Sequence, residues 1–223
     1  MKEAPRKITF DEELGEIRTR LSEMGDEVEL QISNAIKSLV QRDSLLAESV
    51  IAFESEIKIL GEEIDSHCLH LLGQAAPASL DPQFVTQTLK IVIDLERICN
   101  QCSCIARSVL ELNREAQLRP RIDLSIMAET VLTSVKEALS AFLGGNNALA
   151  AQVCHGARMV DDLNDQIQRV LLTVMMEDPA TIWRAMRLNS ISKYLETIAD
   201  HAANIAETVI FVVNGKGRSW PVG

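Results

Sequence analysis

The stretch Asn189–Lys216, NSISKYLETIADHAANIAETVIFVVNGK, carries two periodic patterns at once. Apolar residues recur at alternating steps of four and three, as in a long helix that packs against other helices. Polar residues recur beside them, and a helix places residues four apart above one another. We call these two series the apolar seam and the polar row. The apolar seam is Ile191, Leu195, Ile198, Ala202, Ile205, Val209 and Val212, and the polar row is Glu196, Asp200, Asn204 and Glu207.

A second copy of this stretch lies one hundred residues earlier in the chain. Seven of the 22 positions are identical between 91–112 and 191–212. Further upstream the offset is about 103 residues, as Ala47 and Ala150 show. This internal repeat predicts two three-helix units. Because the connections within each unit are short, each unit is expected to be an antiparallel bundle.

The composition also favours an all-helical protein. Hydrophobic residues make up 47% of the 223 residues, whereas aromatic residues make up only 4%. Strands prefer β-branched and aromatic residues with frequent turns, so this composition suits helices better than sheets. The formal net charge of −10 argues against nucleic acid as a main partner, because phosphate binding needs a basic surface.

The helical pattern predicts an all-α fold of six long helices, arranged as two tandem antiparallel three-helix bundles with an internal pseudo-repeat. The first repeat is expected at 1–118 and the second at 119–216. A flexible tail is expected at 217–223, with Trp220 as a docking candidate. The expected helices span about 11–40, 44–73, 81–118, 123–143, 148–176 and 179–213, with a turn at 144–147.

The sequence predicts a cytoplasmic protein without direct membrane insertion. The segment MKEAPRKITFDEEL at the start has no apolar core of the kind a signal peptide needs. The longest charge-free run, 138–157, contains GGNN and predicts two helix ends and a turn rather than a membrane span. Five cysteines is an odd number, so free thiols in a reducing compartment are expected.

The polar row differs between the two copies. In the second copy three of its four residues are carboxylates, and carboxylates four apart on one helix can share a hard cation. In the first copy one carboxylate remains, and Arg107 supplies positive charge where a metal would sit. A metal site and a solvated helix face are both compatible with the second row. The first row is Glu96, Asn100, Cys104 and Arg107.

Two segments resemble the repeat signature of the PhoU family, the regulators of phosphate uptake. LETIADHAANIAETVIFVVNGK resembles the C-terminal copy of the signature, and DLERICNQCSCIARSVLEL resembles the N-terminal copy. FDEELGEIRTRLSEMG near the start and VLLTVMMEDP before the last helix also match. The resemblance therefore covers nearly the whole chain, from about Thr9 to Lys216.

The resemblance implies two similar bundles, often in a homodimer. It also implies a non-enzymatic cytoplasmic adaptor that links the ATPase of a phosphate ABC transporter to a sensor histidine kinase. Such an adaptor is a negative regulator of the phosphate-starvation genes of the Pho regulon. Since the family holds metal clusters with Glu/Asp-x-x-x-Asp motifs, iron, zinc or another divalent metal is the expected cofactor.

Residue by residue, the resemblance places the metal mainly in the second repeat. Glu196 and Asp200 match the motif of the last helix. Asp161 matches one member of an acidic pair on the helix before it. These three residues are the expected ligands, with Asp165 or Asn204 as additional candidates.

The first repeat departs further from the family pattern. Glu96 and Glu54 match motif positions, and they are the candidate ligands there. Asn100 and Lys58, however, stand where the family has acidic residues. Ala157 is a similar departure in the second repeat. We therefore expect fewer metal sites than the family pattern would supply.

The cysteines offer a rival site. Cys99 and Cys102 could share a helix face, but a soft metal or an iron–sulfur cluster needs about four ligands, and Cys104 points elsewhere. Cys102 lies on the apolar seam, where a small buried hydrophobe is the commoner interpretation. Residues that could complete such a site are His67, Cys68, His70, Cys154 and His155.

Two other functions stay open on the sequence. A carboxylate–metal hydrolase or oxidase could use a helical bundle, but we find no Glu-x-x-His pair with the right partners and no nucleophile motif. A divergent sensor that kept the fold and changed its ligand would suit the cysteine-bearing first repeat. The non-enzymatic regulator is the function that we expect.

Overall fold

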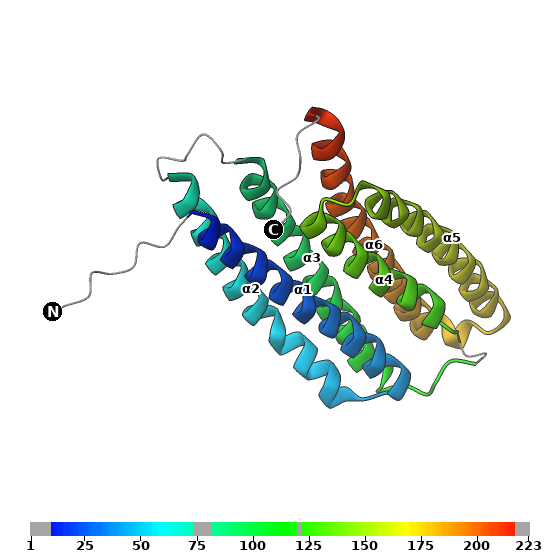
Figure 1. The fold of residues 1–223 in the computed structure, drawn as a ribbon. Coiled ribbons are helices and arrows are strands. Elements are labelled where there is room, and N and C mark those ends of the chain that lie inside the picture. Colours follow the sequence, from blue (N-terminus) through cyan, green and yellow to red (C-terminus); the bar gives the residue numbers. More distant parts are fainter. Residues whose placement is uncertain (1–9, 74–81, 120–121, 217–223) are drawn as a thin grey trace.

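The computed structural model describes residues 10–73, 82–119 and 122–216, and these ranges form six long helices without a strand (Figure 1). The tail 217–223, with Trp220, lies outside the described residues. The prediction of an all-α fold is confirmed. The helices are α1 (Phe10–Gln41), α2 (Ser44–Gly73), α3 (Pro82–Leu112), α4 (Ser125–Gly144), α5 (Asn147–Glu177) and α6 (Ile182–Lys216), and a 3₁₀ turn, η1 (Pro179–Thr181), precedes α6.

The helices form two antiparallel three-helix bundles, α1–α3 and α4–α6, which lie side by side (Figure 1). Between the bundles, α3 packs along α6 and α1 packs along α4. Both copies of the apolar seam are buried, and Leu95 and Leu195 at matching positions are completely enclosed. The internal repeat thus places its two seams at the centre of the molecule. The division of the chain at residue 118 stays a prediction.

Close side-chain contacts join the two bundles. Phe84 of α3 stacks on Phe142 of α4, with ring centroids 5.2 Å apart. The guanidinium of Arg18 on α1 lies over the ring of Phe84, 4.3 Å from its centroid. A Cβ at Gly25 would lie 2.0 Å from a methyl carbon of Leu139, so this glycine lets α1 and α4 approach closely. The bundles therefore share one hydrophobic core.

The helix α3 ends at Leu112, earlier than the predicted end at residue 118. The reason lies in the turn between α1 and α2, where Arg42 adopts a left-handed conformation with φ of 55°. Its guanidinium donates to the carbonyl oxygens of Leu112 at 2.9 Å and of Glu115 at 2.7 Å. Carbonyl groups at the end of a helix need such partners. A side chain from a distant turn therefore stabilises the end of α3.

In the second bundle, the turn between α4 and α5 lies where the sequence predicts it, whereas the end of α6 does not. The predicted turn between α4 and α5 is confirmed, with Gly145 at φ of 60° and Asn146 accepting from the N–H of Leu149 at 3.1 Å. The helix α6 was predicted to end at 213 with a cap at 214–215, but it extends to Lys216. A glycine inside a helix costs only about 1 kcal/mol, which packing can offset. None of the described helices combines the length and hydropathy needed to cross a membrane.

Candidate metal centre

The three main predicted ligands lie on α5 and α6, which pack against each other. Asp161 is on α5, and Glu196 and Asp200 are on α6. Burial raises the pKa of Asp161, and the charge of Glu196 raises it further. Burial also raises the pKa of Asp200, followed by the charges of Asp161 and Glu196. The three carboxylates therefore repel one another across the contact between α5 and α6.

Lys193 is a cation placed against this trio. Its ammonium group forms an ion pair with Glu196, three residues later on the same helix. The hydrogen bond with Glu196 is the main cause that raises the pKa of Lys193, although burial acts in the opposite direction. The Lys193 side chain is 59% exposed, whereas the Glu196 side chain is 14% exposed. The lysine can therefore swing into solvent without opening the bundle, and one ammonium leaves part of the negative charge uncompensated.

Asn164, three residues after Asp161 on α5, has a buried amide oxygen. Its side chain is only 2% exposed, and Oδ1 has no hydrogen-bond partner among the described residues. A buried polar atom without a partner costs about 1–3 kcal/mol, and such atoms are often explained by a bound ion or water. Carboxylate and amide oxygens are the donor types that suit a hard divalent cation. The residues of the second repeat therefore fit a metal chemically.

The side chains do not stand in a coordination arrangement. Within residues 10–73, 82–119 and 122–216, no three His, Cys, Asp or Glu side chains are grouped so that they could hold a metal ion. Carboxylates without a cation between them repel one another. Metal binding would need the exposed carboxyl groups of Asp161 and Asp200 to turn inward, and Lys193 to release Glu196.

The additional candidates of the second polar row lie further out. Asp165 forms an ion pair with Arg169 at 3.7 Å, and its side chain is 66% exposed. Asn204 and Glu207 are exposed on α6. The candidate centre is therefore best described by Asp161, Glu196 and Asp200, with Asp165 and Asn204 at its edge.

The first repeat surrounds Glu54 with nitrogen donors. Nδ2 of Asn100 donates to Oε1 of Glu54 at 3.0 Å, and a guanidinium N–H of Arg107 donates to Oε2 at 3.1 Å. Nζ of Lys58 lies 3.6 Å from Oε1. Burial alone would raise the pKa of Glu54, but these hydrogen bonds and the charge of Lys58 outweigh it, so the pKa is lowered. Both carboxylate oxygens are occupied by groups of the protein itself.

Glu96, the other candidate ligand of the first repeat, lies against Gly61 of α2. A Cβ at position 61 would be 2.3 Å from Oε1 of Glu96, so the glycine supplies the space for this carboxylate. Burial and then the charge of Asp65 raise the pKa of Glu96. Oδ1 of Asp65 is itself buried without a hydrogen-bond partner among the described residues. Glu96 thus has an acidic neighbour, whereas Glu54 has cationic ones.

The five cysteines are free thiols, and the three that are buried are in surroundings that disfavour the thiolate. Cys68, Cys99 and Cys102 are buried, and Cys104 and Cys154 are partly buried. Burial is the main cause that raises the pKa of Cys68 and of Cys99 to about 12, and that of Cys102 well above its ordinary value. Metal ligation needs the thiolate, which is scarce at neutral pH under these conditions. The interpretation of Cys102 as a small buried hydrophobe is confirmed.

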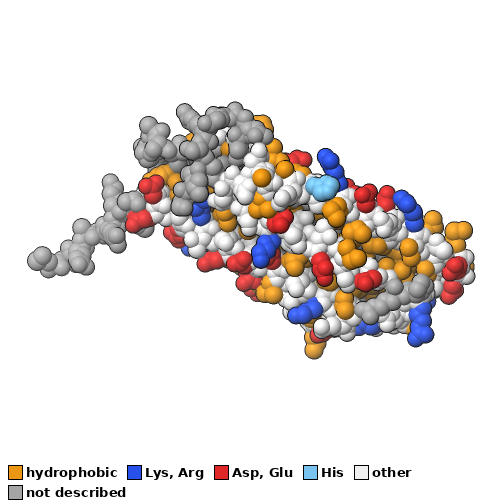
Figure 2. Space-filling view, turned by 45° about the vertical axis from the view of Figure 1, so that its right-hand side comes forward, with side chains coloured by type: hydrophobic (Ala, Val, Ile, Leu, Met, Phe, Trp, Pro, Cys, Tyr) orange, Lys and Arg blue, Asp and Glu red, His pale blue; other side chains and the backbone are white. Residues whose placement is uncertain are grey.

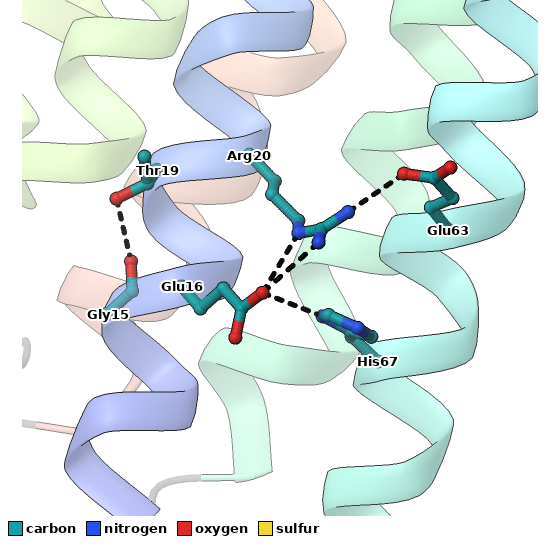
Figure 3. A network of polar contacts seen from close by, with 6 residues as sticks. All are labelled: Gly15, Glu16, Thr19, Arg20, Glu63 and His67. Carbon is teal, nitrogen blue, oxygen red and sulfur yellow. Dashed lines mark hydrogen bonds and ion pairs between the residues drawn. The ribbon is translucent and has the colours of Figure 1, made fainter.

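His67, a candidate partner of the cysteines, belongs to a surface network between α1 and α2 (Figure 3). Its Nδ1 lies 4.0 Å from a carboxylate oxygen of Glu16. Arg20 donates to Glu16 on its own helix and to Glu63 on α2, the latter at 2.8 Å. Exposed ion pairs typically contribute about 0–1 kcal/mol. This network joins two helices at the surface and is no metal site.

A polar contact between the bundles was not found from the sequence. Nδ1 of His201 on α6 lies 2.9 Å from Oδ1 of Asp94 on α3, and the side chains are 12% and 16% exposed. His201 directly follows Asp200, so the contact connects the candidate centre with the first repeat. The two residues lie 107 positions apart in the chain, and no local spacing could have identified Asp94 as the partner.

The two bundles each match one known family. The PhoU domain model matches residues 21–109 and again residues 124–209, which together are more than half of the chain. The chain belongs to the PhoU family. The resemblance identified from the repeat signature is therefore confirmed, and the two matches correspond to the α1–α3 and α4–α6 parts of the chain.

Curated relatives and solved structures agree with this membership. A phosphate-specific transport system accessory protein PhoU homolog from Pseudomonas aeruginosa is 36% identical over 207 residues, which cover 92% of this chain and 86% of the relative. PhoU homolog 2 from Thermotoga maritima is 34% identical and covers 93% and 88%. The crystal structure of PhoU from Pseudomonas aeruginosa has a TM-score of 0.88 over 93% of this chain and all of that chain. PhoU from Streptococcus pneumoniae, titled a phosphate transport system regulatory protein, has a TM-score of 0.83 at 25% identity over 95% of this chain and all of that chain.

Proposed function

We propose that this PhoU protein is a non-enzymatic accessory regulator of phosphate uptake. It acts as an adaptor between the ATPase of a phosphate ABC transporter and a sensor histidine kinase, and it restrains phosphate-starvation genes from the cytoplasm. The observation that carries this proposal is similarity over 92% of the chain to a relative named as a phosphate-specific transport system accessory protein. The activity proposed for the protein is therefore binding of other proteins.

The surface near the turn between α5 and α6 supports a function by protein binding. Figure 2 shows apolar side chains gathered in patches between charged ones. The guanidinium of Arg187 lies over the ring of Trp183, 4.2 Å from its centroid. Trp, Met and Arg are enriched at protein interfaces. The exposed apolar residues near this turn are Met176, Ile182, Trp183 and Met186.

A divalent metal, iron or zinc among the candidates, is proposed to bind in the second repeat. Asp161, Glu196 and Asp200 would hold it, and Lys193 would release Glu196 to solvent. A bound cation supplies positive charge that removes the repulsion among the carboxylates and draws α5 toward α6. Since His201 next to Asp200 contacts Asp94, a change in α6 would be felt in the first repeat.

Pull-down with the cognate transporter ATPase and the histidine kinase, in EDTA and in added metal, tests the adaptor proposal. We expect wild-type protein to retain both partners, with an amount that depends on metal. Asp200→Asn should remove the metal dependence. Glu207→Gln, which removes one exposed carboxylate from the same helix, is the matched control and should behave as wild type. Absence of binding to both partners in every metal state would contradict the proposal.

The proposal includes a homodimer, which light scattering coupled to gel filtration can test. One chain has a mass of 24.7 kDa. Symmetric dimers are the commonest soluble oligomers. A homodimer should have about twice this mass at micromolar protein concentration. The mass of a single chain over the whole concentration range would contradict it.

A further inference from the structure

Where the second repeat has two acids of the candidate centre and a further acid of the polar row, the first repeat has two cations and an amide. With the repeat offsets of 103 and 100 residues, four positions can be compared between the two bundles. Their formal charges add to +1 in the first repeat and to −3 in the second. The equivalent pairs are Glu54 with Ala157, Lys58 with Asp161, Asn100 with Asp200, and Arg107 with Glu207.

These residues converge on the single carboxylate of Glu54. Asn100 and Arg107 each donate to a different oxygen, and Lys58 approaches Oε1. With Nδ2 directed to Glu54, Oδ1 of Asn100 is directed to Cys104, whose Sγ donates to it at 4.0 Å. The amide oxygen that could have been a ligand therefore faces away from Glu54. Guanidinium and ammonium groups have no lone pair to offer a cation.

Glu96 does not compensate for this exchange. Its carboxylate occupies the space above Gly61, where a larger residue would collide with it. At the equivalent position of the second repeat stands Asn164, whose side chain is buried. The oxygens of Glu54 are thus already occupied, and Glu96 lies beside Asp65 rather than among these nitrogen donors.

We propose that the α2–α3 contact of the first repeat is a permanent clasp that needs no metal, in which Arg107, Asn100 and Lys58 hold Glu54. The guanidinium and amide N–H groups replace the cation that the family motif implies at this place. The contact at Glu54 consequently has one state, and it takes no part in a response to divalent metal. The clasp stands on contacts within the first repeat and is independent of the adaptor function.

Urea unfolding of Glu54→Gln in EDTA and in Mn²⁺, together with the number of Mn²⁺ ions bound per chain, tests the clasp. The substitution keeps the size of the side chain and removes its charge. We expect the urea midpoint to fall by the same amount in EDTA and in Mn²⁺, and the Mn²⁺ count to stay at the wild-type value. An unchanged midpoint in EDTA, or the loss of a bound Mn²⁺, would overturn the proposal.

A second variant rebuilds the acidic row. Asn100→Asp places a carboxylate against Glu54, so the midpoint in EDTA should fall and Mn²⁺ should restore part of the loss. The combined change of Lys58→Asp, Asn100→Asp and Arg107→Glu should raise the Mn²⁺ count by one. An Asn100→Asp protein as stable as wild type in EDTA would contradict the clasp.

These measurements separate the clasp from the metal site proposed in the second repeat. If wild-type protein binds no Mn²⁺, the second-repeat proposal loses its support. The fall of the Glu54→Gln midpoint in EDTA still decides whether the clasp exists. If wild-type protein binds one Mn²⁺ ion, and Asp161→Asn loses this ion while Glu54→Gln retains it, the second-repeat site and the metal-independent first repeat are both supported.

Discussion

The two repeats of this protein share one apolar seam and differ in the polar row beside it. Leu95 and Leu195 stand at matching positions, and both are completely buried. Next to them, Glu54 is held by nitrogen donors in the first repeat, whereas acids repel one another around Asp161 and Asp200 in the second. The fold therefore requires the apolar seam, whereas the polar row can differ between the repeats and take a different role in each.

The difference also shows two ways in which helices of a bundle can treat surface carboxylates. In the first repeat opposite charges are supplied by the chain, so the contact is complete after folding. In the second repeat the chain supplies one lysine against three acids, so negative charge is left for an external cation. Neighbouring carboxylates that are only partly compensated repel one another, which makes the second arrangement suited to a ligand-dependent state and the first to a fixed one.

The largest expected effect concerns the shared seam. Leu95→Ala and Leu195→Ala each create a cavity at a fully buried position, which typically costs about 2–5 kcal/mol. Because the seams are equivalent, we expect the two losses in unfolding free energy to be similar. Urea unfolding measures both. A loss below about 1 kcal/mol for one of them would show that the seams are not packed alike.

The contact between the repeats comes next. His201→Ala removes the partner of Asp94 at a place that is mostly buried, and a hydrogen bond to a charged group is worth about 1.5–3 kcal/mol. A double-mutant cycle of His201→Ala with Asp94→Ala should give a coupling of about 1 kcal/mol. Coupling near zero would mean that the contact does not link the repeats energetically.

The clasp should depend on pH in a defined direction. The pKa of Glu54 is lowered from its ordinary value of 4.5, so ionised Glu54 stabilises the fold above that pH. This contribution is lost as the pH falls through the lowered pKa. Glu54→Gln should therefore lower the unfolding free energy by about 1 kcal/mol at pH 7 and by less at pH 3. The expected loss at pH 7 is small because Arg107 is half exposed and solvent screens its charge.

A matched control belongs to this measurement. Glu48→Gln changes an exposed carboxylate on the same helix and should leave the unfolding free energy nearly unchanged at both values of pH. A cost of Glu54→Gln that grows toward pH 3 would contradict the sign of the argument.

The smallest effect is expected at Gly61. An added Cβ would collide with Oε1 of Glu96, which is the far end of a flexible side chain and can move away. Alanine also favours the helix over glycine by about 1 kcal/mol. Gly61→Ala should therefore change the unfolding free energy by less than about 1 kcal/mol. A loss above about 2 kcal/mol would show that Glu96 has no alternative position.

Much of the fold was predictable from the sequence because helical periodicity is a local property. The seam at Leu95 and Leu195 and the turn at 144–147 follow from spacing and turn chemistry, and the structure has both. The end of α3 at Leu112 was not predictable, because it depends on the guanidinium of Arg42, 70 residues away. The local Asn-Gly pair at 214–215 predicts a helix end at residue 213, but α6 continues to Lys216.

The candidate site was predictable only in part. The spacing of Glu196 and Asp200 showed that they share a helix face, and Asp161 followed from the family motif. The ion pair of Lys193 with Glu196 and the buried Asn164 depend on the packing of α5 on α6. The substitution of Asn100 was visible in the sequence, but its bond to Glu54 needed the arrangement of two helices.

The most direct test of the difference between the repeats is anomalous diffraction from crystals of the wild-type protein grown with Mn²⁺. We predict an anomalous peak between α5 and α6, within bonding distance of Asp161, Glu196 and Asp200. We predict no peak between α2 and α3 at Glu54, where Arg107 and Asn100 remain in contact with its carboxylate. A peak at Glu54, or a metal-free second repeat beside an occupied first repeat, would contradict this account.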